Sequence, residues 1–196
     1  MGHSRAEKAH SRERIISAAA RQIREAGLER ISIAELMKEA DLTHGGFYGH
    51  FASRSELIAA ALERALADGE GASASAMKAR GSRTLKTILN SYLSPAHRDN
   101  TGAGCAISAL AGDVGRAGPE VRAIMTQRLE EYFASMSEAL GDGPKADDHA
   151  VAAWCTMVGA VVLSRVFKGD QRSDAILRQA RKAILQLDGV SSTASG

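Results

Sequence analysis

Hydrophobic residues recur at spacings of three and four along almost the whole chain, which is the period at which an α-helix presents one face to a core. Alanine is abundant, runs of β-branched residues are scarce, and prolines number three. Every segment long enough to classify therefore predicts a helix, and the expected fold class is all-α. The predicted helices span about residues 8–26, 33–40, 44–50, 54–80, 83–94, 105–116, 119–140, 145–168 and 172–187.

Helix-boundary signals are clearest in the first 53 residues. Gly27 is placed to end the first helix in a left-handed conformation. The S-x-x-E spacing of a capping box begins at Ser32 and again at Ser53, and Thr43 is placed to cap the short helix between them. Two short helices around a tight turn, after a longer first helix, predict a helix-turn-helix, with an ordinary helical hairpin as the alternative. The expected core of this unit is Ile16, Ile23, Ile33, Leu36, Leu42, Phe47 and Phe51.

The helices that follow predict a second body. The last two, at about 145–168 and 172–187, carry wide apolar stripes that suit an antiparallel pair burying further surface against a second subunit. Alternatively, both stripes close the core of a single subunit. We therefore expect a helix-turn-helix domain at residues 1–53 and a second helical domain at 54–196.

Composition and charge narrow the class of protein. A charged share of 24% argues against a membrane protein, and a hydrophobic share of 44% argues against a disordered one. The first residues run into charged sequence without an apolar stretch, so we expect no secretory signal and a cytoplasmic protein. The net charge is only +2, but residues 1–24 hold six basic side chains against two acidic ones, a pattern typical of a basic arm.

Residues 40–57 read ADLTHGGFYGHFASRSEL and closely resemble the DNA-binding signature of TetR-family transcriptional regulators. The match is ordered and ungapped: a small-x-aliphatic-Thr turn, then Gly45, an aromatic residue followed by Tyr48, a His-Phe pair, and a Ser-basic-x-Glu-Leu start to the next helix. The resemblance implies an N-terminal three-helix helix-turn-helix domain joined by a long helix to a C-terminal helical domain for ligand binding and dimerisation. The C-terminal two thirds resembles the family by architecture and only loosely by sequence.

The resemblance also implies which residues contact DNA. Contacts that position the protein on the DNA backbone fall to Ser32, Thr43, Tyr48, His50 and Arg54, whereas His44, Gly45 and Gly46 face the bases. The alternatives to DNA contact are that the Tyr48 ring packs under its helix and that His50 is an orienting or packing residue.

Glycines set the character of the predicted recognition helix. Three of them in about seven residues weaken that helix and predict few base contacts by side chains, with His44 the main one and DNA shape supplying the rest. Asp41 stands where the family often has glycine, in a left-handed turn that Asp tolerates. Arg5, Lys8 and Arg12 form the basic arm, which we expect to reach phosphates or the neighbouring minor groove.

For the second domain, the resemblance implies a homodimer through the last two helices, about 145–187, and a ligand cavity among the helices between about 83 and 168. Because no cluster of Lys or Arg marks the middle of the chain, we expect a neutral, apolar effector, and Arg165 is the exception that could pair with a carboxylate. The candidate lining, each member of which could equally be core, is Tyr92, Cys105, Met125, Tyr132, Phe133, Trp154 and Met157.

The expected function is therefore a ligand-responsive repressor that binds a palindromic operator as a homodimer, with no cofactor or metal. One alternative is a DNA-binding regulator that has no small-molecule effector or that senses through the thiol of Cys105, which lies near a helix start where a thiol pKa falls. An inert buried thiol is the other interpretation of that cysteine. A small helical enzyme is a remoter alternative, since the sequence has no histidine spacing typical of a metal site, no nucleophile elbow and no phosphate loop.

Overall fold

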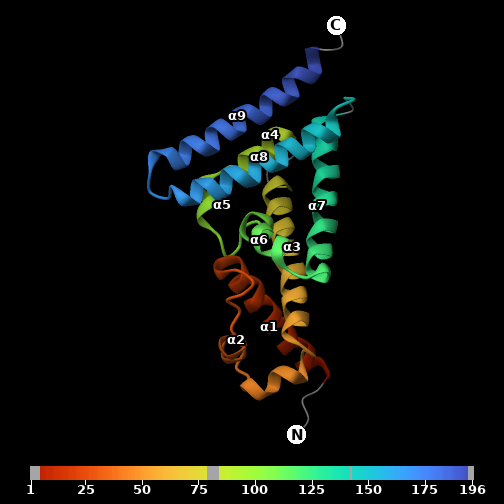
Figure 1. The fold of residues 1–196 in the computed structure, drawn as a ribbon, viewed down its shortest axis with the longest axis vertical. Helices are drawn as coiled ribbons and strands as arrows, with labels where there is room; N and C mark the ends of the chain where they lie inside the picture. Colours follow the sequence, from red (N-terminus) through yellow and green to blue (C-terminus); the bar gives the residue numbers. More distant parts are fainter. Residues whose placement is uncertain (1–4, 79–83, 142, 194–196) are drawn as a thin grey trace.

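The computed structural model describes residues 5–78, 84–141 and 143–193, and within these ranges it is helical and has no strand. The all-α prediction is confirmed. A long central helix connects two ends of an elongated molecule: α1 and α2 lie at one end, and α8 and α9 lie at the other (Figure 1). The elements are α1 Arg5–Ala26, α2 Ile33–Glu39, the 3₁₀-helix η1 His44–Gly49, α3 Arg54–Lys78, α4 Leu85–Tyr92, α5 Pro95–Asp99, α6 Ala106–Arg116, α7 Pro119–Leu140, α8 Ala146–Val166 and α9 Gln171–Thr193.

The predicted signals at the end of α1 and the start of α2 are present in the structure, and some of their hydrogen-bond partners are distant in the sequence. Gly27 ends α1 with a φ of 89°, as predicted. The Ser32 hydroxyl accepts from the Glu35 N–H, but the Glu35 carboxylate accepts from Gln22 instead of closing the capping box. The Ser32 N–H in turn donates to the Gln22 side chain, which replaces the missing half of the box. Tertiary contacts with α1 therefore complete the start of α2.

The short helix predicted at about 44–50 is present as the 3₁₀-helix η1, because its glycines stabilise the α-helical form poorly. Two other boundary predictions are wrong. Thr43 precedes η1 but makes no capping hydrogen bond through its side chain. Pro95 opens the unpredicted helix α5, where its missing N–H costs nothing and the Ser94 hydroxyl accepts from the His97 N–H.

Two hydrophobic cores lie along the molecule. One begins in the predicted helix-turn-helix and continues through α3 into α6 and Met125 of α7. The other is formed by α4, α7, α8 and α9. Of the predicted helix-turn-helix core, Ile33 and Leu42 are partly buried and the remainder is buried, namely Ile16, Ile23, Leu36, Phe47 and Phe51. The first core thus joins the amino-terminal unit to α3 and α6.

Polar contacts join the same elements at the end of α1. The guanidinium of Arg24, a residue 6% exposed, donates from Nε to the Gly102 carbonyl at 2.6 Å and from Nη1 to the Ala65 carbonyl at 3.2 Å. Arg24 also pairs with Asp68 at 3.3 Å. We call this set of contacts the Arg24 clamp. It ties α1 to α3 and to the loop before α6.

Helix α8 is long and apolar enough to cross a bilayer by length and composition, and it is the single helix in the described ranges that passes this test. Core helices of folded domains pass it as well. In this fold α8 packs against α7 and α9. The apolar residues of α8 lie partly on its buried face and partly on its surface, where Leu163 and Val166 are exposed.

Candidate functional site

The turn between α2 and η1 is closed by backbone hydrogen bonds and a left-handed residue. Asp41 has a φ of 55°, the conformation that its place in the sequence predicts. Its N–H donates to the Lys38 carbonyl at 3.1 Å, and the Leu42 N–H donates to the Met37 carbonyl at 2.8 Å. This tight turn sets the direction in which η1 leaves α2.

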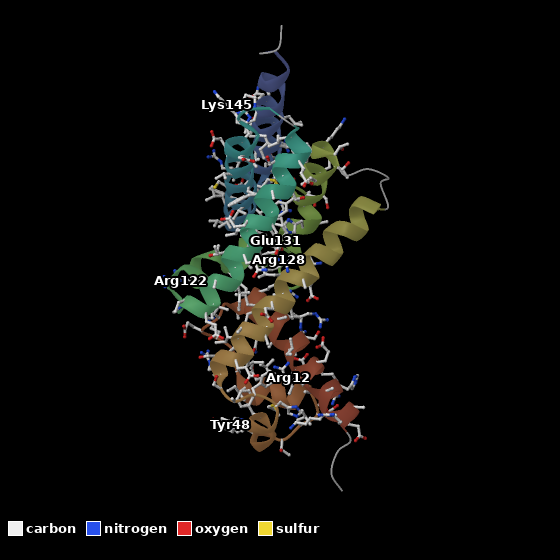
Figure 2. All side chains as sticks on the ribbon, turned by 90° about the vertical axis from the view of Figure 1, so that its right-hand side faces the viewer. Arg12, Tyr48, Arg122, Arg128, Glu131 and Lys145 are labelled. Carbon is white, nitrogen blue, oxygen red and sulfur yellow. The ribbon has the colours of Figure 1, made fainter. Side chains whose placement is uncertain are left out.

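Two buried phenylalanines fix η1 to the rest of the unit. Phe47 and Phe51 are 2% and 1% exposed, and their rings stack with centroids 5.6 Å apart. Tyr48, between them in sequence, is 77% exposed and meets Phe47 only edge-on, at 5.2 Å between ring centroids. Figure 2 shows Tyr48 at the lower end of the molecule, pointing away from the ribbon. The alternative that the Tyr48 ring packs under its helix does not match this geometry.

The outer surface of η1 has few side chains. His44, Gly45 and Gly49 are exposed, and a Cβ added at either glycine would meet no atom within 4 Å. Gly46 is more enclosed, since its Cβ would lie 3.5 Å from the Met37 methyl group. The exposed backbone is therefore open to close approach, and His44 and Tyr48 project from it.

Two arginines predicted to contact DNA, Arg54 and Arg12, bind other groups of the protein itself. The Nη2 of Arg54 donates to the Leu28 and Glu29 carbonyls at 3.2 and 3.0 Å, which holds the α1–α2 loop against the start of α3. Arg12 pairs with Glu56 at 3.1 Å and lies over the Phe51 ring at 4.7 Å. The sequence does not predict these roles, because each arginine is far along the chain from the group that it contacts.

The other predicted DNA-facing residues lie around the same end. Arg5 and Lys8 are exposed in the first turns of α1, so they belong to a helix rather than to an extended arm. Thr43 is exposed and Ser32 is partly exposed. His50 is partly buried, and its backbone carbonyl accepts from Arg12 at 3.4 Å. Hydrogen bonds from Ala52 and Arg12 lower the pKa of Glu56, which keeps it ionised beside Arg12.

The predicted ligand-lining residues separate into two groups. Tyr92, Trp154 and Tyr132 form an aromatic row, with ring centroids 5.4 Å apart for the first pair and 4.9 Å for the second. Phe133 and Met157 belong to the same carboxyl-terminal core. Met125 lies in the other core, away from this row, whereas Cys105 packs against both cores.

His97 is a residue of this region that sequence reasoning set aside. Its Nδ1 lies 2.7 Å from the Tyr92 carbonyl, and its Nε2 accepts from the Cys105 N–H at 3.1 Å. A carbonyl only accepts, so Nδ1 carries a proton. Because Nε2 accepts a hydrogen bond, it carries none, and the ring is neutral. Burial lowers the pKa of His97, which favours that neutral form. The Ser94-Pro95 helix start was the local signal that could have located it.

No group of three or more His, Cys, Asp or Glu side chains lies close enough to hold a metal ion in the described ranges. Cys105, the residue before α6, is partly exposed, and Cys155 on α8 is exposed.

The family described as "Bacterial regulatory proteins, tetR family" matches residues 15–61, the segment that contains α2, the turn and η1. Two uncharacterized HTH-type transcriptional regulators from strains of Mycobacterium tuberculosis, MT0206 and Rv0196, are each 29% identical over 185 residues. The alignment covers 89% of this chain and 94% of each relative.

Solved structures show the same fold. A TetR-family regulator from Cytophaga hutchinsonii superposes with a TM-score of 0.77 at 16% identity, covering 95% of this chain and 98% of that one. A TetR regulator from Chloroflexus aurantiacus gives 0.76 at 23% identity, covering 91% and 94%. The reduced form of E. coli NemR gives 0.72 at 21% identity, covering 89% and 95%. With its helix-turn-helix at one end and its helical second body at the other, the chain belongs to the TetR family of bacterial transcriptional regulators.

Proposed function

We propose that this TetR-family protein is a ligand-responsive repressor that binds a palindromic operator as a homodimer and leaves it when a small molecule binds. The observation that carries the proposal is the outer face of η1, where exposed backbone and Tyr48 stand on a buried base of Phe47 and Phe51. A base-reading element needs this combination of a rigid support and an open surface.

On DNA, the exposed backbone at Gly45 and Gly49 lets η1 approach the major groove closely, and the sequence is read largely through DNA shape. His44 and the glycines face the bases, and Tyr48 binds a phosphate through its hydroxyl group. The remaining contacts to the DNA backbone are assigned to Ser32, Thr43, His50 and Arg54. Arg54 acts chiefly by holding the loop to which it donates.

Tyr48→Ala is expected to weaken operator binding several-fold and to lower the slope of log K against log salt by about one, since one phosphate contact is lost. The measurement is a mobility-shift titration at several salt concentrations against a palindrome from the gene's own neighbourhood. Tyr48→Phe keeps the ring and removes only the hydroxyl group, so it is expected to lower the salt slope like Tyr48→Ala if the hydroxyl group makes the phosphate contact. Binding by Tyr48→Ala with unchanged affinity and salt slope contradicts the assignment.

The proposed dimer interface is the exposed apolar face of α8 with its continuation on α9. We call it the α8 patch; it consists of Val151, Val162, Leu163, Val166, Phe167 and Leu185. Residues 151, 155, 159, 162 and 166 follow helical spacing, and Gly159 within this row permits close approach of a second helix. A second copy of the chain fits this face because a palindrome needs two recognition elements about one DNA turn apart.

Leu163→Glu is expected to raise the dimer dissociation constant by about 10-fold or more, because it places an unpaired charge in an apolar interface. Sedimentation velocity over a concentration series measures the monomer fraction. Thr126→Glu adds the same charge to an exposed position on α7 and is expected to leave the dimer intact. A wild-type protein that stays monomeric at every concentration contradicts the interface itself.

Release follows if ligand binding among α4, α6, α7 and α8 alters the tilt of α3 and so the separation of the two η1 elements. A coupling free energy of about 1–3 kcal/mol lowers operator occupancy about 5- to 150-fold. The thiol alternative remains a prediction for Cys105, which is partly exposed at the start of α6. The family is one of DNA-binding regulators rather than enzymes, and we place the protein in the cytoplasm with its DNA.

A further inference from the structure

A polar cluster lies inside the carboxyl-terminal core, where Arg165 of α8 meets the start of α6 and the end of α4. The Arg165 guanidinium donates from Nε to the Arg98 carbonyl at 3.0 Å. Its Nη1 lies 3.4 Å from both the carbonyl and the hydroxyl oxygen of Ser108. The side chain of Tyr92 interacts with those of Cys105, Ser108 and Arg165. A cation, a phenol, a serine hydroxyl and a thiol therefore converge from three helices.

Arg165 Nη2 and the hydroxyl oxygen of Tyr92 are buried, and neither makes a hydrogen bond of normal geometry in the described part of the chain, although the Cys105 and Ser108 side chains lie beside the Tyr92 hydroxyl group. Tyr92 is 8% exposed, so its hydroxyl group lies away from bulk solvent. A buried donor left unpaired is destabilising, and more so when it is charged. Such atoms in a native fold need a partner from outside the chain, which is a bound water, an ion or a ligand group.

The charge of Arg165 is also unmatched. All of its hydrogen-bond partners in the described ranges are backbone carbonyls or a hydroxyl group, and none is a carboxylate. Asp99 is close enough for an electrostatic interaction, but its two carboxylate oxygens are held by Arg98 at 2.9 and 3.0 Å. Burial lowers the pKa of Arg165, because the charged guanidinium loses part of its hydration.

The surroundings of the cluster are aromatic. Tyr92 lies edge-on to Trp154, and Trp154 stacks on Tyr132 with ring planes 10° apart. The His97 ring lies 4.4 Å from the Tyr92 ring and is neutral, so it adds no second cation. Arg165 and Cys105 are partly exposed, which connects the cluster to solvent. A ligand here would meet one partly buried cation beside an apolar, planar lining.

We propose that the effector is an organic monocarboxylate with an apolar or aromatic body, whose carboxylate accepts hydrogen bonds from Arg165 Nη2 and the Tyr92 hydroxyl. Arginine is suited to this task because its planar guanidinium matches carboxylate geometry and stays charged. The proposal rests on the proposed ligand response and replaces the neutral effector that the sequence predicts. The aromatic row supplies the contact surface for the body of the ligand.

The site has a short physical route to the DNA-binding end. Arg165 holds the Arg98 carbonyl and the start of α6, which flank the loop whose Gly102 carbonyl accepts from Arg24. A carboxylate that draws the guanidinium toward itself competes with those carbonyl contacts. The loop before α6, and with it the end of α1, then shifts.

Binding is tested on the full-length protein with benzoate and with benzamide, which has the same ring and no charge. Trp154 is the single tryptophan of the chain and touches Tyr92, so its fluorescence reports the titration, and calorimetry checks the affinity. We expect benzoate to bind in the micromolar to millimolar range and benzamide to bind about 10-fold more weakly or worse.

Arg165→Gln is expected to weaken benzoate binding by about 10-fold or more, and Tyr92→Phe by about 3- to 10-fold. Both variants should leave the weak binding of benzamide unchanged. Arg172→Gln, which alters an exposed arginine of α9, is the matched control and should bind benzoate like wild type. If Arg165→Gln does not fold, Tyr92→Phe decides alone, since it removes one oxygen atom and keeps the ring.

Equal binding of benzoate and benzamide, or no benzoate binding up to about 10 mM, overturns the proposal. Inorganic phosphate that binds as tightly as benzoate overturns the assignment to an organic carboxylate. These measurements need no DNA, so they are independent of the repressor proposal. Benzoate binding that depends on Arg165 but leaves the operator complex unchanged supports the site and contradicts the effector role.

Discussion

Phe47→Ala is expected to lower the free energy of unfolding by about 3–5 kcal/mol and to abolish operator binding. The Phe47 side chain is 2% exposed and stacks on Phe51, so its removal leaves a cavity under η1 that the surrounding helices fill only partly. For a chain of this size the loss corresponds to a fall in Tm of about 6–20 °C. Thermal and urea denaturation followed by circular dichroism measure it.

Tyr48→Ala is the matched control for that result, because it truncates a neighbouring aromatic residue that is 77% exposed. Its effect on unfolding is expected to stay within about 0.5 kcal/mol, although it weakens DNA binding. The two variants thus distinguish a residue that stabilises η1 from a residue that contacts DNA. A small stability change at Phe47 would mean that η1 does not depend on this ring for its position.

Arg24→Met is expected to lower the free energy of unfolding by about 2–4 kcal/mol. The substitution removes the donor to the Gly102 and Ala65 carbonyls and leaves those acceptors unpaired, while the methionine fills most of the volume. Asp68 keeps a second partner in Arg64 at 2.6 Å, which limits the loss. Urea denaturation measures the change, and ligand titration of the operator complex shows whether α1 still follows the loop before α6.

Arg21→Met tests whether any arginine of α1 would give the same result. Arg21 pairs with Glu39 on the surface, where the two side chains are 50% and 52% exposed. An exposed ion pair is worth about 0–1 kcal/mol because water and salt screen it. Equal losses for the two variants would show that burial of the Arg24 clamp adds nothing.

The amino-terminal unit was the part that sequence reasoning predicted best. The glycine end of α1, the Ser32 cap and the left-handed Asp41 all depend on residues a few positions apart, whose geometry is local. The burial of Phe47 and Phe51 is predicted from the same short segment, whereas the sequence leaves open whether the Tyr48 ring is packed or exposed. The errors there are also physical, since a glycine-rich segment has too little α-helical preference to decide between α and 3₁₀ geometry.

For the carboxyl-terminal half, the sequence predicts the helices but not which side chains contact one another. The sequence predicts the aromatic residues only as separate candidates, and it groups Met125 with residues that lie in another core. Each aromatic or methionine residue on a helical stripe suits either core equally well. Only the packing of α4, α7 and α8 decides which of them meet.

The sequence by itself determined the helical class and the helix-turn-helix signature, because capping, periodicity and turn chemistry act over a few residues. The tertiary structure alone decided the partners of the arginines. Arg24 reaches Gly102 across 78 positions, Arg165 reaches Arg98 across 67, and Arg12 reaches Glu56 across 44. An arginine on a helix face has no local preference for a partner, so its role as a clamp, a support or a carboxylate site follows from which helices pack beside it.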